Sequence, residues 1–424
     1  MPVVLVAIIK VVVPLLVILN LLPLMIWLER KGSAFIQDRP GPNRAQILGV
    51  RLGGLVHSLA DVLKLLFKED IIPNHVNKIF YLAAPVITLF VACVTFIVIP
   101  FADALPLKNG GFFTFQAADL NAGILYTLAM TSLGVYGIML AGWSSNNKFA
   151  LLGGLRSSAQ MISYELSMGI AVLTVVMVSG SLSLNDIVLA QGANPLTWNC
   201  LRLLPACLVF IVAAFAETNR SPFDLPEGES ELVAGYHVEY SSMKFAMFFM
   251  AEYINMIVAS ALIVTLFFGG WQIPFVDTAT LRDNADKLVY YSALGFGSFS
   301  LLVGLILVTK FKKGYYGDSR DYEVLVLGVP AILVGLLLLV GTLINGHFYF
   351  GTEAKQIWAA LFQIGLFLAK TLFMCWVFIW VRWTLPRFRY DQLMTLGWKY
   401  MLPTSLVTVF AAALVMLLMS QQDQ

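Results

Sequence analysis

The sequence contains few charged residues for its length. Only 12% of its 424 residues are charged, whereas 59% are hydrophobic, and the mean hydropathy is +0.81. A soluble domain carries roughly 25% charged residues. So few charges could not cover so much apolar surface in water, so lipid must be the solvent of this chain. The small fraction of charged residues excludes a water-soluble protein. The net charge of +2 excludes no class of protein.

The usual signatures of a cofactor site or a catalytic centre are also absent. The four cysteines, Cys93, Cys200, Cys207 and Cys375, form no CxxC pair, which argues against zinc or iron–sulfur ligation. They are interpreted as buried apolar thiols. The sequence has no phosphate-binding glycine loop, no metal-ligand cluster and no nucleophile–base signature. A freestanding enzyme is therefore the least favoured class, and no nucleic-acid partner is expected.

Long apolar runs, in contrast, fill most of the chain. A membrane span needs about 20 mainly apolar residues. Ten such runs occur, at about 3–28, 79–100, 120–142, 159–179, 199–216, 244–268, 288–309, 324–345, 356–381 and 402–419. The sequence therefore predicts an all-α polytopic membrane protein.

Basic residues alternate between the loops that join these runs. One set of alternate loops holds twenty Lys and Arg residues, and the opposite set holds only Lys108, Arg282, Lys287 and Lys355. Short cytoplasmic loops retain basic residues. The basic set is therefore placed in the cytoplasm or matrix, and both termini are placed on the outer, periplasmic side.

One segment of the first basic loop has the pattern of an amphipathic helix. Between Leu52 and Phe67, apolar residues recur with a period of 3.6, and polar residues such as His57, Asp61 and Lys64 occupy the other face. This pattern fits a helix that lies in the membrane interface and equally one that packs on a partner subunit.

Some ionisable residues lie well inside predicted spans. Glu165 and Glu252 lie in the fourth and sixth spans, and Lys370 lies in the middle of the ninth. A charge inside a bilayer costs on the order of 3 kcal/mol or more, so such residues usually mark ion routes or polar sites. Lys10 is close enough to the outer end of the first span to reach the interface.

The loop between the fifth and sixth spans is acidic, against the basic bias of its side. It contains Glu217, Asp224, Glu227, Glu229, Glu231 and Glu239. Carboxylates as close as the middle three titrate as a coupled set, which suits a proton store or a charge-sensing switch. The alternative is a solvated acidic loop, but interleaved apolar residues such as Phe223 argue that the loop folds back into protein.

Three long segments resemble a known family. ERKGSAFIQDRPGPNR (29–44), continued by ADVLKLLFKED (60–70), resembles the first signature of the H-type (subunit 1) family of respiratory complex I, the proton-translocating NADH:quinone oxidoreductase. AETNRSPFDLPEGESELVAGYHVEYSSMKFAMFFMAEY (216–253) resembles the second signature, and WVRWTLPRFRYDQLMTLGWKYMLP (380–403) the C-terminal one. The resemblance covers about 1–270 and 355–424.

The resemblance implies a substrate, partners and a location. In this family the interfacial helix and the first and sixth spans frame a tunnel through which a quinone, ubiquinone or menaquinone, enters from lipid. NAD, FMN and the iron–sulfur clusters are then held only by partner subunits. The implied partners are the iron–sulfur and quinone-site subunits of the peripheral arm, the neighbouring membrane-arm subunits and the bilayer. The implied location is a bacterial cell inner membrane.

The resemblance also assigns residues by matching position. The implied quinone-binding residues are Glu29, Arg30, Arg39, Arg44, Phe223 and Asp224. The implied proton-coupling residues are Glu165, Glu217, Asp224, Glu227, Glu229, Glu231, Glu239, Glu252 and Lys370. Reducing a quinone takes up protons and creates transient negative charge. The hypothesis is that this charge shifts the protonation of the acidic loop and that Glu165 and Glu252 relay the change inward.

This chain departs from the usual family pattern of eight spans plus the interfacial helix. Residues 271–352 are expected to add a two-span hairpin between a membrane domain, 1–270, and a C-terminal two-span segment, 353–424. The hairpin spans lack charges, and Gly295, Gly297, Gly304 and Gly335 favour close helix packing. The hairpin is predicted to be a peripheral packing element that faces lipid or another subunit.

Two other functions remain open at this point. A homologous subunit of a membrane-bound hydrogenase or ferredoxin-linked complex would couple electron transfer to ion movement without a quinone. A stand-alone secondary transporter would also use intramembrane charges. The sequence shows no inverted internal repeat, which disfavours the transporter.

Overall fold

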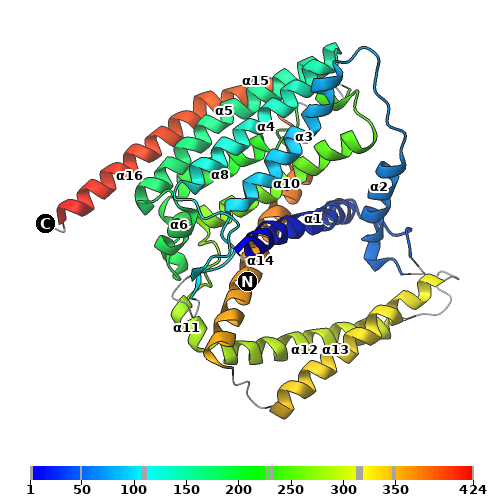
Figure 1. The fold of residues 1–424 in the computed structure, drawn as a ribbon, viewed down its shortest axis with the longest axis vertical. Helices are drawn as coiled ribbons and strands as arrows, with labels where there is room; N and C mark the ends of the chain where they lie inside the picture. Colours follow the sequence, from blue (N-terminus) through cyan, green and yellow to red (C-terminus); the bar gives the residue numbers. More distant parts are fainter. Residues whose placement is uncertain are drawn as a thin grey trace.

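Apolar helices long enough to cross a membrane dominate the fold (Figure 1). The computed structural model describes residues 3–47, 50–106, 112–225, 228, 233–311, 319–345 and 350–422. Within these residues, nine helices have the length and apolar composition of a membrane span. They confirm the predicted all-α polytopic class.

The helices follow one another with short connections. The long ones are α1 (Val3–Ile36), α3 (Lys78–Thr95), α4 (Gly123–Ser144), α5 (Lys148–Ser179), α10 (Ser242–Phe267), α12 (Ala285–Thr309), α13 (Glu323–Asn345), α14 (Thr352–Thr384) and α16 (Leu402–Gln422). The shorter ones are α2 (Val56–Phe67), α6 (Leu184–Gln191), α7 (Asn199–Arg202), α8 (Leu204–Glu217), α11 (Thr278–Asp283) and α15 (Tyr390–Thr395). The two-residue strands β1 (Leu105–Pro106) and β2 (Phe112–Phe113) pair antiparallel, and a π-helical turn, η6 (Leu396–Met401), precedes α16.

The fifth predicted span, 199–216, is not one continuous helix. Leu203 leaves helical geometry (φ −123°, ψ 43°), and this separates α7 from α8. Pro205 lies in the first turn of α8, where a proline is tolerated because its missing N–H would have no partner there. At 14 residues α8 is about 21 Å long, which is shorter than the roughly 30 Å hydrocarbon core. Averaged hydropathy hid this break because Arg202 is the one charged residue in the run.

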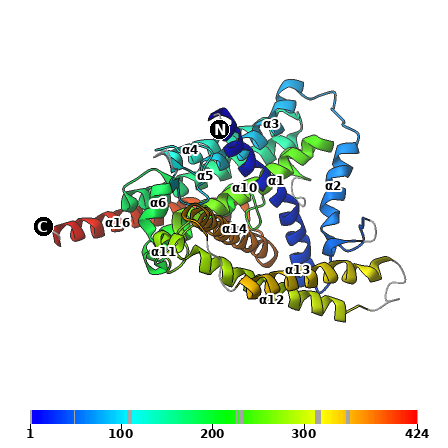
Figure 2. The ribbon, with the colours of Figure 1, turned by 60° about the horizontal axis from the view of Figure 1, so that its bottom comes forward.

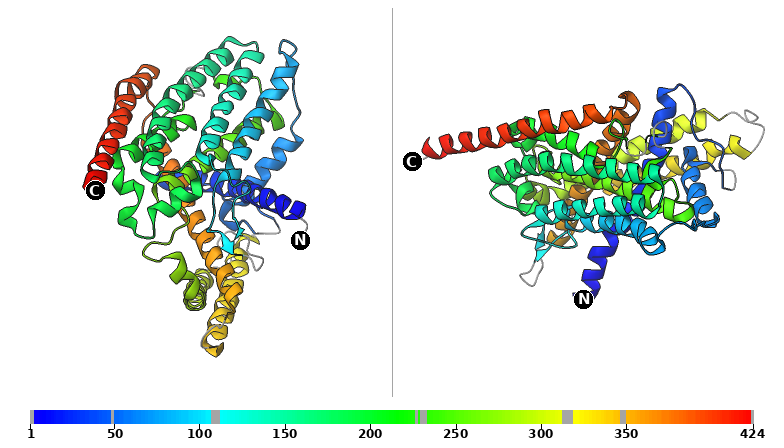
Figure 3. Two further views of the ribbon diagram at one scale, coloured as in Figure 1. Left: turned by 60° about the vertical axis from the view of Figure 1, so that its left-hand side comes forward. Right: turned by 90° about the horizontal axis from the view of Figure 1, so that it is seen from above.

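Helix α10 lies at the centre of the bundle. Its apolar residues point in all directions, and residues such as Ile254, Ile257 and Leu266 are fully buried. Figures 1 and 3 show α10 among α3, α5, α8 and α14, with α16 running out along the edge of the bundle. The main apolar core joins α10 to residues of α1, α5, α8 and α14. A helix that is apolar all round is stable only when it is surrounded in this way.

The predicted hairpin is present as α12 and α13, and it lies apart from the main bundle (Figure 2). Its two helices pack at close range through glycines: a Cβ at Gly304 would lie 2.8 Å from the Gly328 carbonyl oxygen, and one at Gly335 would lie 2.7 Å from the Leu301 nitrogen. Gly297 also lies in this contact. Gly295, however, faces open space, so it is not part of the packing.

The predicted amphipathic helix is α2. Val56 and Ser58 are buried against the protein, whereas the apolar side chains Leu59, Leu63 and Leu66 are about half exposed. The Ser58 hydroxyl donates a hydrogen bond to the Pro23 carbonyl of α1 (3.0 Å). Figure 1 shows α2 on the outer side of α1, well separated from α4 and α5. The apolar face of α2 is therefore available for contact with lipid or with a partner subunit.

Candidate functional site

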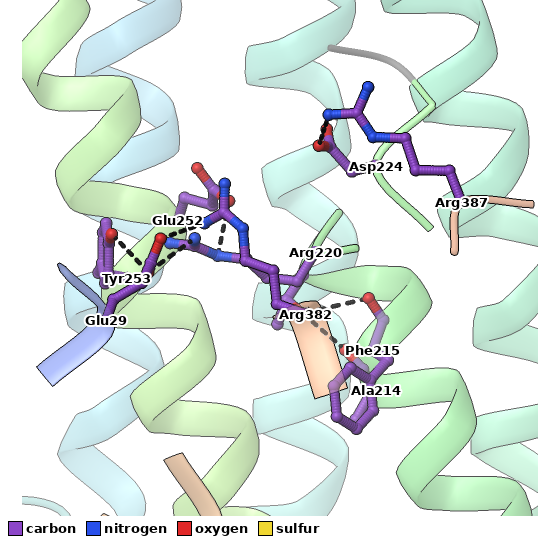
Figure 4. A network of polar contacts seen from close by, with 10 residues as sticks. Glu29, Ala214, Phe215, Arg220, Asp224, Glu252, Tyr253, Arg382 and Arg387 are labelled. Carbon is purple, nitrogen blue, oxygen red and sulfur yellow. Dashed lines mark hydrogen bonds and ion pairs between the residues drawn. The ribbon is translucent and has the colours of Figure 1, made fainter. Parts of the chain in front are cut away.

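A buried group of charged side chains joins four segments that are distant in the sequence (Figure 4). Glu29, near the end of α1, accepts hydrogen bonds from Tyr253 (2.8 Å), Arg382 (2.6 Å) and Arg220 (3.3 Å). Arg220 also forms an ion pair with Glu252, with 2.7 Å between Nε and Oε1. Glu252 and Tyr253 lie on α10, and Arg382 lies on α14. We call these five residues the Glu29 network.

The charges of this network balance in a largely buried site. Glu29 is 8% exposed and Arg220 is 2% exposed. Burial by itself would lower the pKa of Arg220. The neighbouring Glu252, Tyr253 and Glu29 together outweigh that effect, so the pKa lies above its usual value. The guanidinium therefore stays charged, and it also lies over the Tyr253 ring at 4.1 Å. Buried charges persist only where partners compensate them in this way.

The chain reaches Arg220 through a tight turn after α8. Asn219 adopts a left-handed backbone conformation (φ 50°), which reverses the chain immediately before Arg220. The side-chain amide of Gln160 on α5 fastens this turn, donating to the carbonyls of Ala216 (2.7 Å) and Phe223 (3.0 Å) and to Asn219 Oδ1 (3.1 Å). Gln160 was not among the predicted site residues, although a buried amide inside an apolar span was the available signal.

Asp224 forms a second ion pair beside the network. Its carboxylate accepts a hydrogen bond from Arg387 at 2.9 Å, and the carboxylate is buried while the arginine is half exposed. Burial raises the pKa of Asp224 above its usual range, and Arg387 and Arg382 oppose that shift. The pair thus joins the loop after α8 to the segment after α14, as Figure 4 shows.

The C-terminal segment holds the same loop through its backbone and through aromatic contacts. The Phe388 N–H donates to the Pro222 carbonyl at 3.1 Å. The Phe223 ring packs edge-on against Tyr164 and tilted against Phe388, with ring centres 5.5 and 5.4 Å apart. The Tyr164 hydroxyl donates to the Leu393 carbonyl at 2.8 Å. Phe223 is 4% exposed, so its observed contacts are with protein side chains.

Two carboxylates lie deeper in the bundle. Glu165 on α5 accepts a short hydrogen bond from Ser132 on α4. Glu217, the last residue of α8, is close enough to Glu165 for the two to interact electrostatically. Glu217 also lines a small enclosed cavity together with Thr131 and Asn255. Residues of α3, α4, α5, α8 and α10 form the wall of this cavity. Glu217 therefore borders a mostly apolar cavity, and Glu165 lies beside it on α5 without lining that cavity.

Lys370 lies where α10 ends. Its amine donates three hydrogen bonds, to the carbonyls of Phe268 (2.9 Å), Gly270 (3.0 Å) and Gln272 (2.8 Å). It also lies over the Trp198 ring at 4.4 Å. Phe268 caps the end of α10, and Gly270 and Gln272 lie in the turn that follows, where carbonyls need partners from outside the helix. Lys370 therefore satisfies carbonyls that would otherwise be left unbonded in an apolar environment.

We expect Lys370→Met to lower the stability of the protein by about 3 kcal/mol, because buried carbonyls would lose a charged donor. The measurement is the midpoint of thermal unfolding of the detergent-purified complex. Lys370→Arg is the matched control, since it keeps a charged donor at the same position. Equal midpoints for Lys370→Met and the wild type would show that the three hydrogen bonds are not needed to hold the end of α10.

The predicted arginines of the first loop lie outside the Glu29 network. Arg30 forms an exposed ion pair with Asp61 of α2 at 2.5 Å. Arg39 contacts the Gln37 amide oxygen at 2.7 Å and is exposed. Arg44 is also exposed, and its backbone N–H donates to the His57 ring at 3.1 Å. The structure therefore gathers Glu29 with Glu252, places Asp224 nearby, and leaves these arginines at the surface.

The other predicted acidic residues are divided between described and undescribed parts of the chain. Glu239 accepts a hydrogen bond from the Asn147 side chain at 2.7 Å, and its backbone carbonyl accepts one from Tyr81. Glu227, Glu229 and Glu231 lie outside the described residues. Among the residues that are described, no three His, Cys, Asp or Glu side chains group as metal ligands.

The prediction from sequence missed three members of the Glu29 network. Arg220 and Arg382 were counted only as basic residues that set the orientation, and Tyr253 was not considered. Glu29 is 191 positions from Arg220 and 353 from Arg382 in the chain. No spacing rule connects such distant positions. The available signal was a basic residue at the end of a span inside each of the two later signature segments.

Comparison with known proteins identifies the family. A family model described as NADH dehydrogenase matches residues 8–413. The chain belongs to the NADH dehydrogenase family. It is 44% identical over 393 residues to the H subunit of the NADH-quinone oxidoreductase of Salinibacter ruber, covering 92% of this chain and 90% of that protein. It is 45% identical over 398 residues to NADH-quinone oxidoreductase subunit 8 of Rhodothermus marinus, covering 93% of each.

A third relative shows the same degree of similarity. An H subunit of the NADH-quinone oxidoreductase of Solibacter usitatus is 44% identical over 400 residues, covering 93% of this chain and 92% of that protein. The division of the chain into residues 1–270, an inserted hairpin at 271–352 and residues 353–424 stays a prediction.

Proposed function

We propose that this chain, as the H-type membrane subunit of an NADH:quinone oxidoreductase, forms the quinone site and couples quinone reduction to proton translocation. The observation that carries the proposal is the buried Glu29 network, which lies where α1, α10 and α14 meet, close to an amphipathic helix with an open apolar face. A quinone has a polar head and a long apolar tail. It therefore needs an apolar route that ends near charged groups and hydrogen-bond donors.

Each part of that requirement has a counterpart in the described residues. The exposed apolar side of α2, with Leu59, Leu63 and Leu66, offers a surface on which a tail can leave the lipid. The network offers donors and carboxylates that are shielded from water. In this proposal Arg30, Arg39 and Arg44 belong to the cytoplasmic mouth of the route, and ubiquinone or menaquinone is the substrate. NADH, FMN and the iron–sulfur clusters belong to partner subunits.

The coupling step follows from the shared arginine. Arg220 contacts both Glu29 and Glu252, so a new negative charge or a proton near Glu29 changes how strongly Arg220 holds Glu252. Low-dielectric surroundings strengthen such coupling because water cannot screen it. We propose that a change in protonation then passes from Glu252 to Glu217 and Glu165, toward the interior of the bundle. The acidic loop with Asp224, Glu227, Glu229, Glu231 and Glu239 acts on the cytoplasmic side, with both termini of the chain on the periplasmic side of the inner membrane.

Glu29→Gln is expected to lower NADH-driven quinone reduction by at least about tenfold, because it removes the carboxylate that the two arginines and Tyr253 hold. The measurement is the quinone reductase rate of membranes that contain the assembled complex. Asp391→Asn is the matched control: it removes one carboxylate from an exposed pair with Arg389 in the nearby C-terminal segment. We expect this control to leave the rate unchanged.

Two outcomes would contradict the proposal. A normal rate for Glu29→Gln in fully assembled complex would remove the network from the quinone site. The second outcome is that wild-type membranes reduce no added quinone with NADH and that the chain co-purifies with a hydrogenase- or ferredoxin-linked module. This outcome would place the chain in a quinone-independent complex. The two results are distinguished by which other proteins accompany the chain after purification.

A further inference from the structure

A strained turn connects the first loop to α2. Leu52, Gly53 and Gly54 follow one another with positive φ angles of 49°, 62° and 101°. Leucine rarely adopts such a conformation. A Cβ at Gly54 would lie 2.2 Å from the Pro42 carbonyl oxygen, so only glycine fits there. A turn of this kind persists only when contacts from elsewhere hold it.

Contacts from two distant helices hold this turn. The Trp27 indole of α1 donates a hydrogen bond to the Gly53 carbonyl at 3.0 Å. On the other side, the Glu323 carboxylate accepts from the backbone N–H groups of Arg51 (3.1 Å) and Gly53 (3.4 Å). The Arg51 guanidinium approaches the second carboxylate oxygen at 2.5 Å. Two N–H groups that converge on one carboxylate oxygen form the backbone concavity that favours anions.

The pair of Arg51 and Glu323 is buried. Both side chains are 8% exposed. Glu323 is the first residue of α13, so the contact fastens the hairpin to the start of α2, 272 positions away in the sequence. Figures 1 and 2 show one end of α13 reaching the segment before α2, while most of the hairpin is remote from α2. The hairpin is therefore not only a peripheral packing element.

Few other contacts fix the position of α2 relative to α1. Ser58 bonds to Pro23 (3.0 Å), and the Arg30–Asp61 pair is exposed at 43% and 40%. Exposed pairs contribute little rigidity. At the far end of α2, the Ser242 hydroxyl contacts the carbonyls of Leu65 and Lys68. The start of α2 is therefore held by the turn, by Ser58 and by the His57 ring, which accepts from the Arg44 N–H, and Glu323 and Trp27 together hold the turn.

We infer that Glu323 is a positioning residue for quinone access: by holding the turn at Arg51 and Gly53, it sets the spacing between α1 and α2 through which the quinone tail passes. This inference rests on the proposed function. It predicts an effect on how well long-tailed quinones enter and little effect on the reaction once the head is bound. Replacing a residue that merely supported folding would impair quinone entry and the reaction of the bound quinone together.

The test compares Glu323→Ala, Glu323→Gln and the matched control Glu69→Gln in purified, fully assembled complex. Glu69 is exposed just beyond the other end of α2. Hydrogen–deuterium exchange of peptides covering 50–56 is expected to become about tenfold faster in Glu323→Ala, because two amides lose their acceptor. Glu323→Gln keeps an acceptor oxygen and should show a smaller change. Glu69→Gln should match the wild type.

The kinetic part uses one quinone with a long isoprenoid tail and one with a short alkyl tail. For Glu323→Ala we expect KM for the long-tailed quinone to rise roughly fivefold while kcat stays within about twofold, which indicates weakened access and not weakened chemistry. The short-tailed quinone should be affected less. Glu323→Gln should again fall between Glu323→Ala and the wild type.

Each other outcome overturns the inference in a recognisable way. Unchanged exchange at 50–56 would show that Glu323 does not hold the turn. Faster exchange with unchanged KM for both quinones would show that the turn does not control access. Glu29→Gln is measured in parallel: if it also leaves quinone reduction intact, the proposed function has failed, whereas if it lowers turnover, only the inference about Glu323 has failed.

Discussion

Arg220→Met is expected to abolish quinone reduction, with turnover falling at least about 100-fold. Arg220 is 2% exposed and contacts both carboxylates of the Glu29 network. Removing one partner of a buried ion pair costs roughly 3–5 kcal/mol, because the remaining charge stays buried without compensation. That cost is expected to reduce assembly, and turnover per assembled complex is expected to fall because both carboxylates lose the cation that couples them.

The experiment separates the role of Arg220 in assembly from its role in turnover. Quinone reductase activity is measured per assembled complex, and the assembled fraction is determined from the purified complex. Arg220→Met with Glu252→Gln removes the stranded carboxylate, so the double variant should assemble better than Arg220→Met but remain inactive. Arg220→Lys keeps the charge but lacks the planar guanidinium, whose separate Nη1 and Nε atoms reach Glu29 and Glu252. Assembly with normal turnover in Arg220→Met would contradict the proposed coupling through this residue.

The membrane spans could be predicted from sequence because each one depends on local apolar content. Nine of the ten predicted runs correspond to long helices, and the amphipathic pattern of 52–67 corresponds to α2. The division of 199–216 into α7 and α8 escaped prediction because it depends on the backbone at Leu203, which average hydropathy does not report. The close packing of the hairpin was predicted from its glycines, except that Gly328 was missed and Gly295 lies in open space.

The candidate site was predictable only in part, because charge within a span is visible in sequence but the partner of that charge is not. Glu29 and Glu252 were named, yet nothing in the sequence connects them to Arg220 and Arg382. Lys370 was named as an intramembrane charge, but its three carbonyl partners lie at the cap of another helix and in the turn that follows it. Glu323 was not singled out, because an acidic residue at the first position of a helix ordinarily needs no other explanation.

The contact between Arg51 and Glu323 also changes how the hairpin is understood. A sequence comparison by signatures alone treats α12 and α13 as an addition between two family segments. Because the first residue of α13 holds the turn before α2, the hairpin and the first loop form one structural unit.

Glu165→Gln and Glu217→Gln are each expected to reduce the protons translocated per quinol by at least about tenfold, since each removes a titratable carboxylate from the interior between α4, α5 and α8. Quinone reduction itself should continue, because neither residue belongs to the Glu29 network. The ratio is measured in proteoliposomes with a pH-sensitive dye inside and a quinol assay outside. Asp186→Asn, an exposed carboxylate on α6 that accepts a hydrogen bond from Ser181, is the matched control.

The double variant decides whether the two carboxylates act on one route. Glu165 and Glu217 interact electrostatically, so their contributions should not be independent. If both serve a single proton path, Glu165→Gln with Glu217→Gln should be no worse than either single variant. If the losses multiply instead, the residues act on separate steps. Unchanged proton translocation in both single variants would mean that these carboxylates only shape the electric field of the bundle and carry no protons.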